Sequence, residues 1–229
     1  MPSKQLEKVY YKVEPIFPPV KILKRIYQKF REPKRYKYLF EIIRKNKCKK
    51  IMEIGTWNGN HALQMIEEAK EYFPAKEIEY YGFDLFELMD GRKYIEEISK
   101  RAPALSVVKE RLEKTKAKIN LYKGDTREIL PGVINNLPKM DFVFIDGGHS
   151  IETIENDWKY TQQVMDEQTI VIFDDYWNRD GAGCKKVIEN IDRAEFDVKI
   201  LPKQDKFKKE WGILKINFVQ VKRRGGSIL

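Results

Sequence analysis

The feature that most constrains the fold is a regular alternation of short, apolar, β-rich runs with longer segments of helical periodicity. The sequence predicts strands at 50–54, 78–83, 117–122, 141–145 and 169–173. It predicts helices between them at 60–73, 87–115, 126–136, 151–165 and 182–190. Parallel strands need crossover connections, which are usually helical, so this order indicates a doubly wound, Rossmann-like α/β domain with a mostly parallel sheet.

The ends of the chain depart from this alternation. Two further strands, 196–201 and 211–219, are predicted to form a C-terminal antiparallel hairpin across a lysine-rich loop, which gives a seven-stranded sheet. Proline-rich residues 1–35 are interpreted as an N-terminal cap or lid, 36–221 as the α/β domain and 222–229 as a flexible tail.

Composition limits the class of protein. The chain has 229 residues, 42% of them hydrophobic and 34% charged, which is typical of a globular domain. No apolar run approaches the roughly 20 residues of a membrane span, and the start lacks a signal core, so a cytoplasmic location and no membrane association are expected. Cys48 and Cys184 lack metal or redox spacing and are expected to be buried free thiols.

The net charge of +9 is concentrated in lysine-rich runs at 44–50, 109–118 and 203–209. Such runs would strengthen binding to a polyanion, so nucleic acid is a compatible partner, although the runs are more often solvated surfaces and nucleic acid is not favoured. The sequence leaves open whether the chain forms a homo-oligomer.

A glycine-rich turn follows the first strand. Glu53 closes that strand, and Gly55 and Gly59 permit a tight turn into the next helix, where backbone N–H groups can hold a carboxylate. Asp84 and Asp125 end the next two strands, where they are positioned for a ribose diol and an adenine amino group. Each aspartate could instead be a helix cap.

A second polar group follows the fourth and fifth strands. Asp146 and His149 come after one strand, and Asp174 and Asp175 end the other, so all four meet at one sheet edge. Adjacent carboxylates repel, and a divalent cation such as Mg²⁺ or Mn²⁺ would relieve that repulsion. His149 could act as general base or metal ligand, or it could belong to a loop that caps the following helix.

These motifs resemble the class I S-adenosylmethionine-dependent methyltransferases. The matching segments are 53–59, 82–84, 124–125 and 141–146. The resemblance implies S-adenosylmethionine as the cofactor, and it implies a cofactor site made of Glu53, Gly55, Thr56, Trp57, Asn58, Gly59, Asp84, Asp125 and Asp146.

The segments 146–149 and 174–187 are similar to metal-dependent small-molecule O-methyltransferases of the catechol and macrolide-sugar types. That resemblance implies that Asp146, Asp174 and Asp175 hold Mg²⁺ or another divalent cation. His149 stands where the catechol group has a lysine, so the sequence departs from that pattern there.

The resulting hypothesis is an O-methyltransferase that acts on a small-molecule hydroxyl, such as a sugar or a secondary metabolite, with Asp146 and His149 in catalysis. The alternatives are an RNA or protein methyltransferase, motivated by the positive charge, and a non-catalytic cofactor-binding module, which the fold alone does not exclude. The chain lacks the Asn-Pro-Pro-aromatic motif of base-amino methyltransferases, and the spacing of its glycines disfavours a nicotinamide-dependent oxidoreductase.

Overall fold

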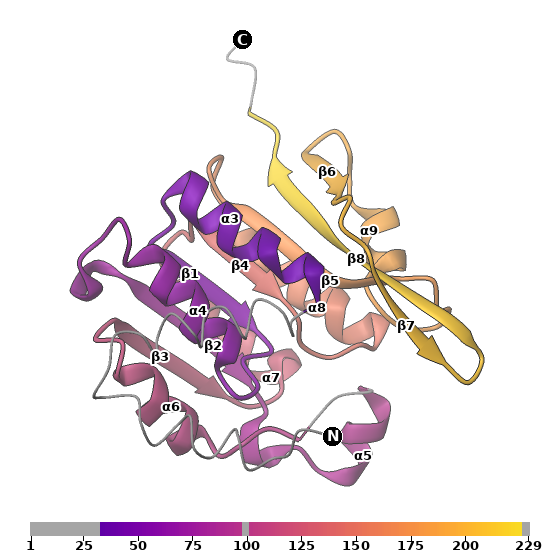
Figure 1. The fold of residues 1–229 in the computed structure, drawn as a ribbon, viewed down its shortest axis with the longest axis horizontal. Helices are drawn as coiled ribbons and strands as arrows, with labels where there is room; N and C mark the ends of the chain where they lie inside the picture. Colours follow the sequence, from indigo (N-terminus) through magenta and orange to yellow (C-terminus); the bar gives the residue numbers. More distant parts are fainter. Residues whose placement is uncertain (1–32, 98–100, 226–229) are drawn as a thin grey trace.

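A computed structural model of the protein describes residues 33–97 and 101–225. An eight-stranded sheet with the order β3-β2-β1-β4-β5-β8-β6 forms its centre, and β7 pairs with β8 off this path (Figure 1). The parallel strands are β1 (Lys50–Ile54), β2 (Glu79–Asp84), β3 (Lys118–Lys123), β4 (Phe142–Ile145) and β5 (Ile170–Trp177). The antiparallel strands are β6 (Phe196–Ile200), β7 (Asp205–Lys209) and β8 (Gly212–Arg223).

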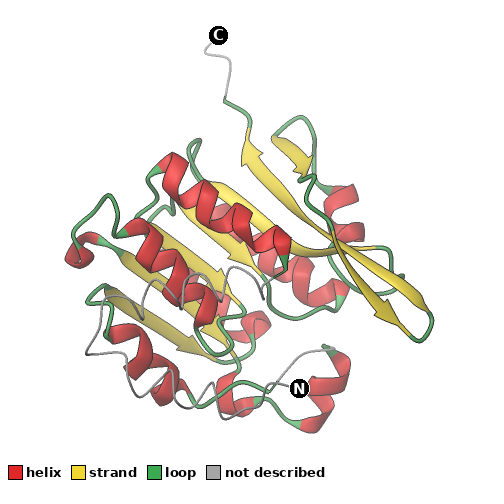
Figure 2. Cartoon of the chain, in the orientation of Figure 1, coloured by secondary structure: helices red, strands yellow, loops and turns green. Residues whose placement is uncertain are grey.

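Helices cover both faces of the sheet (Figure 2). One layer contains α3 (Lys37–Asn46), α4 (Asn60–Ala69) and α6 (Leu105–Glu113), and the other contains α7 (Thr126–Val133), α8 (Ile151–Thr161) and α9 (Lys185–Asn190). Helix α5 (Gly91–Glu96) contacts the sheet edge through Lys93 and Asp125. The 3-10 turns are η1 (Lys34–Tyr36), η2 (Ala75–Glu77), η3 (Phe86–Leu88), η4 (Ile134–Asn136) and η5 (Gln162–Val164).

The central strands are apolar on both faces, and this divides the core in two. In β4, Val143 and Ile145 pack in the layer of α7, α8 and α9, whereas Phe142 and Phe144 pack in the layer of α3, α4 and α6. Successive strand side chains point to opposite faces, so a continuous apolar run is what a sheet covered on both sides requires. The predicted doubly wound α/β fold is confirmed.

The single helix predicted for residues 87–115 is wrong. The described part of this segment contains η3, α5 and α6, and residues 98–100 lie outside the described chain. Asp90 begins α5 by accepting a hydrogen bond from the Lys93 amide. Pro103 separates α5 from α6, because a proline disfavours helical backbone at the residue before it.

The lysine-rich loop predicted between the last two strands contains strand β7 instead, so the predicted number of seven strands is wrong and the sheet has eight. β7 pairs with the start of β8 from Asp205↔Ile216 to Lys209↔Gly212, so a hairpin extends beyond the helical layers (Figure 1). Lysines on an edge strand discourage its pairing with other chains. Because β7 is rich in lysine, the sequence predicted a loop there and not a strand. β8 also pairs with β6 antiparallel, as predicted.

The structure describes only part of the predicted N-terminal and C-terminal segments. Most of the N-terminal cap at 1–35 and the end of the tail at 226–229 lie outside the described residues. β8 continues to Arg223, two residues beyond the expected end of the domain. No helix among the described residues combines the length and the apolar character needed to cross a membrane.

Candidate active site

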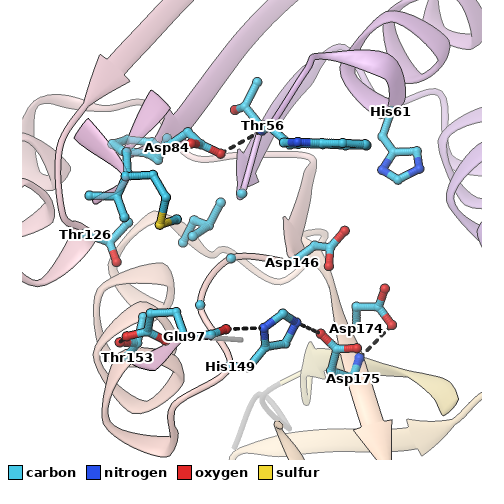
Figure 3. Close-up of a pocket in the computed structure, with 18 of the residues that line it drawn as sticks. Thr56, His61, Asp84, Glu97, Thr126, Asp146, His149, Thr153, Asp174 and Asp175 are labelled. Carbon is cyan, nitrogen blue, oxygen red and sulfur yellow. Dashed lines mark hydrogen bonds and ion pairs between the residues drawn. The ribbon is translucent and has the colours of Figure 1, made fainter. Parts of the chain in front are cut away.

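A cavity of about 680 Å³ runs along the carboxyl edge of the sheet. Its lining includes the turns after β1, β2 and β3, continues past the ends of β4 and β5, and reaches β7 and β8. Ligands of doubly wound sheets bind at this edge, and roughly 300–1,000 Å³ is usual for small-molecule sites. Figure 3 shows Thr56 and Asp84 on one side of the cavity, with Asp146, His149, Asp174 and Asp175 together on another.

The glycine turn after β1 needs its glycines. Gly55 has a φ of +95°, and a Cβ there would lie 1.9 Å from the Asp146 carbonyl oxygen. Gly59 has a φ of +72° at the start of α4, where a Cβ would lie 3.1 Å from a Val108 methyl carbon. Only glycine adopts such backbone readily, so Gly55 lets the ends of β1 and β4 approach each other beside the cavity.

Asp84 organises the neighbouring turn. Its two carboxylate oxygens accept hydrogen bonds from the backbone N–H groups of Trp57 and Phe86, both at 2.7 Å. Burial raises the pKa of Asp84 despite these bonds. Because a carboxylate oxygen has two lone pairs, Asp84 can still accept from a ligand while it holds Trp57, whose φ is 47°. Thr56, Trp57 and Asn58 line the cavity with Asp84.

Glu53 lies within the core and is not among the residues that line the cavity. It accepts a hydrogen bond from the Tyr80 hydroxyl, and its other oxygen has no hydrogen-bond partner among the described residues. Burial raises the pKa of Glu53 to about 8. The geometry therefore gives Glu53 a position beneath the turn, where Tyr80 also contacts Thr56.

Asp125 lines the cavity and also caps α7, as the alternative interpretation predicted. Its carboxylate accepts hydrogen bonds from the Arg127 backbone and guanidinium and from Lys93 at 2.8 Å. These partners, above all the Arg127 side chain, hold the pKa of Asp125 well below its usual value. In this conformation both carboxylate oxygens of Asp125 already accept hydrogen bonds from the cationic side chains of Arg127 and Lys93.

The acidic cluster at the ends of β4 and β5 consists of Asp146, Asp174 and Asp175. One oxygen from each lies within 4.8 Å of the others. The ladder between β5 and β8 shifts register between Phe173 and Tyr176, and Asp175 has a φ of 57°. Bulges and non-glycine residues in left-handed backbone are common at functional sites, where they redirect side chains. Burial, followed by repulsion within the cluster, raises the pKa of both Asp146 and Asp174.

His149 bridges this cluster to α5. Its Nδ1 lies 2.5 Å from the Glu97 carbonyl oxygen and its Nε2 lies 2.6 Å from Asp175 (Figure 3). Burial opposes its charged form, but the hydrogen bond and charge of Asp175 outweigh burial and raise the pKa of His149 to about 9. In the described conformation His149 is therefore a cation that orients Asp175, with neither nitrogen free to take a proton. The adjacent Ser150 caps α8.

Sequence interpretation missed several residues of the cavity. Arg35 and Tyr36 of η1 reach the acidic cluster, and His61 of α4 stacks on Tyr36 with ring centroids 4.2 Å apart. Glu97 accepts hydrogen bonds from Ser150 and Thr153 and so holds the His149 loop. None of these residues belongs to a motif, and the pattern around each gave no signal of its contacts.

The donor set fits a divalent cation. Three carboxylates converge, and Mg²⁺ prefers oxygen ligands. Asp146 is the least engaged of the three, since its side chain accepts one long hydrogen bond, from the Tyr36 hydroxyl at 3.5 Å, among the described residues. Asp174 is bonded through both oxygens to Arg35, so a cation would meet competition there.

A family model described as a methyltransferase domain matches residues 52–176, which is more than half of the chain. The chain belongs to this methyltransferase family. The match extends from β1 to β5, so it contains the glycine turn, Asp84, Asp125 and the whole acidic cluster. No curated protein matches the chain in sequence at a significant level.

Solved structures share the fold of this methyltransferase. An O-methyltransferase from Bacillus cereus in complex with SAH has a TM-score of 0.56 and 14% identity, with 93% of this chain and 96% of that chain covered. The O-methyltransferase TomG from Streptomyces achromogenes, in complex with SAM, has a TM-score of 0.56 and 14% identity over 84% of this chain and 80% of its own. The SAH-bound Podospora anserina methyltransferase PaMTH1 has a TM-score of 0.56 and 16% identity, with coverages of 97% and 89%. At these identities the likeness shows the class I methyltransferase fold.

Proposed function

We propose that the chain is an S-adenosylmethionine-dependent O-methyltransferase that acts on a small-molecule hydroxyl with the help of a divalent cation. The observation that carries this proposal is the continuity of the cavity from the Gly55 turn and Asp84 to the acidic cluster. The similar folds of two O-methyltransferases solved in complex with SAM or SAH support it.

The cofactor would occupy the end of the cavity beside β1 and β2. Asp84 would accept hydrogen bonds from the ribose hydroxyls, and the Gly55 turn would let the cofactor lie close to the backbone. Thr126 and Asp125 would border the adenine. The methyl group would then lie on the side of the cavity lined by Asp146, and positioning of this kind can supply much of the rate of a transfer reaction.

The acceptor would bind beyond the acidic cluster. Asp146, Asp174 and Asp175 would hold the divalent cation, which when bound lowers the pKa of an acceptor hydroxyl and orients it. Asp146, the least engaged carboxylate, would act in catalysis as a ligand of the cation. His149 is the candidate to take the hydroxyl proton, and it would have to release Asp175 first.

The test is transfer of labelled methyl from S-adenosylmethionine to panels of catechols and sugars, with and without exhaustive chelation. We expect cofactor binding, and turnover that chelation and Asp146→Asn both abolish, while the exposed-site control Asp197→Asn keeps full turnover. Full activity after chelation would refute the metal assistance. Salt-sensitive methylation of RNA without turnover of small molecules would refute the acceptor class.

A further inference from the structure

Arg35 lies against the acidic cluster, although it is 139 residues from Asp174 in the sequence. Its Nε donates to one carboxylate oxygen of Asp174 and its Nη2 to the other, both at 2.8 Å. Only 4% of Arg35 is exposed. A buried, two-bonded guanidinium–carboxylate pair of this kind is among the stronger polar contacts in proteins.

A second acid holds Arg35 from the other side. Asp205, at the start of β7, accepts hydrogen bonds from the backbone N–H groups of Lys34 and Arg35 at 2.8 and 3.0 Å. It also lies 3.3 Å from Nη1 of Arg35. The guanidinium carbon stands 4.7 Å from the centroid of the Tyr36 ring, which adds a cation–π contact. The position of Arg35 is thus fixed by η1 and β7, independently of Asp174.

This arrangement changes the electrostatics of the cluster. Each oxygen of Asp174 already accepts two hydrogen bonds, one from Arg35 and a second from the Asp175 backbone N–H or the Tyr36 hydroxyl. A divalent cation that used all three carboxylates would therefore have to displace Arg35 from an Asp174 oxygen. A buried arginine left without a partner would be costly, but Arg35 would keep Asp205 when Asp174 turned to the cation. Because Arg35 is bonded to both Asp174 and Asp205, it can release Asp174 and still have a charged partner. With Asp174 as its one acidic partner, it could not.

We propose that Arg35 is a resident counter-cation of the acidic cluster, and that a divalent cation binds by competing with it for Asp174. Arg35 thereby sets the affinity of the site for metal. The inference rests on the metal assistance proposed above, and it goes further by identifying the residue that limits metal binding.

The test is calorimetric titration of Mn²⁺ into the full chain without cofactor, with the bound ion followed by electron paramagnetic resonance. Arg35→Gln removes the charge and is expected to tighten Mn²⁺ binding by about tenfold or more. Arg35→Lys keeps the charge but loses the paired geometry, so its affinity for Mn²⁺ is expected to lie between that of the unaltered protein and that of Arg35→Gln. The control Arg44→Gln alters an exposed arginine paired with Glu68 and should leave binding unchanged.

Asp205→Asn provides a test in the opposite direction. It removes the acid that would retain Arg35, so Arg35 should hold Asp174 more firmly and Mn²⁺ should bind more weakly than in the unaltered protein. Opposite shifts from the two neighbouring substitutions would support the exchange of partners, because a general loss of structure would weaken binding in both.

Unchanged or weaker Mn²⁺ binding in both Arg35 variants would overturn the inference, with thermal melting used to confirm that the variants are folded. Absence of Mn²⁺ binding in every variant would also overturn it, together with the proposed metal assistance. Methyl transfer that survives chelation would then show that the methyltransferase proposal stands without a metal.

Discussion

Two buried acidic groups at opposite parts of the site are accommodated differently. Glu53, below the first turn, accepts a hydrogen bond from the neutral Tyr80 hydroxyl, and burial raises its pKa to about 8. Asp174, in the metal-type cluster, is bonded by the guanidinium of Arg35. Burial raises the pKa of both acids, and at Asp174 the charge and hydrogen bonds of Arg35 oppose that rise. The first end of the site is therefore organised by shape and neutral contacts, and the second by charge.

The largest expected effect concerns shape. Gly55→Ala would place a Cβ 1.9 Å from the Asp146 carbonyl oxygen in backbone with a φ of +95°, so β1 and β4 could not keep their approach. We expect loss of measurable S-adenosylmethionine binding by calorimetry. Gly91→Ala is the matched control, because a Cβ there meets nothing within 4 Å. Equal binding by both variants would refute the claim that the turn shapes the cofactor end.

The next effect concerns charge. Asp205→Asn removes an acceptor of two backbone N–H groups and a partner of buried Arg35. We expect the free energy of unfolding to fall by about 1–3 kcal/mol, measured by urea denaturation. Asp197→Asn, which alters an exposed pair with Arg224, should change it by less than about 0.5 kcal/mol. A similar fall in the free energy of unfolding in both variants would mean that the buried pair stabilises the fold no more than the exposed pair does.

The third effect is a dependence of stability on pH that arises from Glu53, at the first end of the site. The pKa of Glu53 is raised in the folded chain, so between about pH 4.5 and 8 the unfolded chain binds fewer protons and stability falls as pH rises. The limiting slope is roughly 1.4 kcal/mol per pH unit. Glu53→Gln should remove this contribution and make the protein more stable than the unaltered chain at pH 8.5, while the two should be similar at pH 5.

Urea denaturation across this pH range measures the difference, with Glu128→Gln as the control at an exposed glutamate. A curve for Glu53→Gln that runs parallel to that of the unaltered protein would mean that Glu53 is ionised in the folded state. The conclusion that Glu53 is neutral in the folded protein would then be wrong.

The comparison also explains how much could be predicted from the sequence. Local patterns predict the alternation of strands and helices, the glycine turn, Asp84, Asp125 and the acidic cluster, because the carboxyl ends of parallel strands lie at one edge of the sheet. Arg35 and Asp205 could not be found in this way, since each bonds to residues that are distant in the sequence. β7 was missed because its exposed lysines resemble a loop, and Asp125 proved to be bonded to Arg127 and Lys93, which no spacing indicates.

Calorimetric titration of S-adenosylmethionine into the unaltered protein tests the central claim most directly. The account predicts binding of one cofactor per chain, weakened about tenfold or more by Asp84→Asn, which removes a charged acceptor, and unchanged by Asp197→Asn. Absence of binding, or equal affinity in all three proteins, would contradict a cofactor site at the β1–β2 end of the cavity.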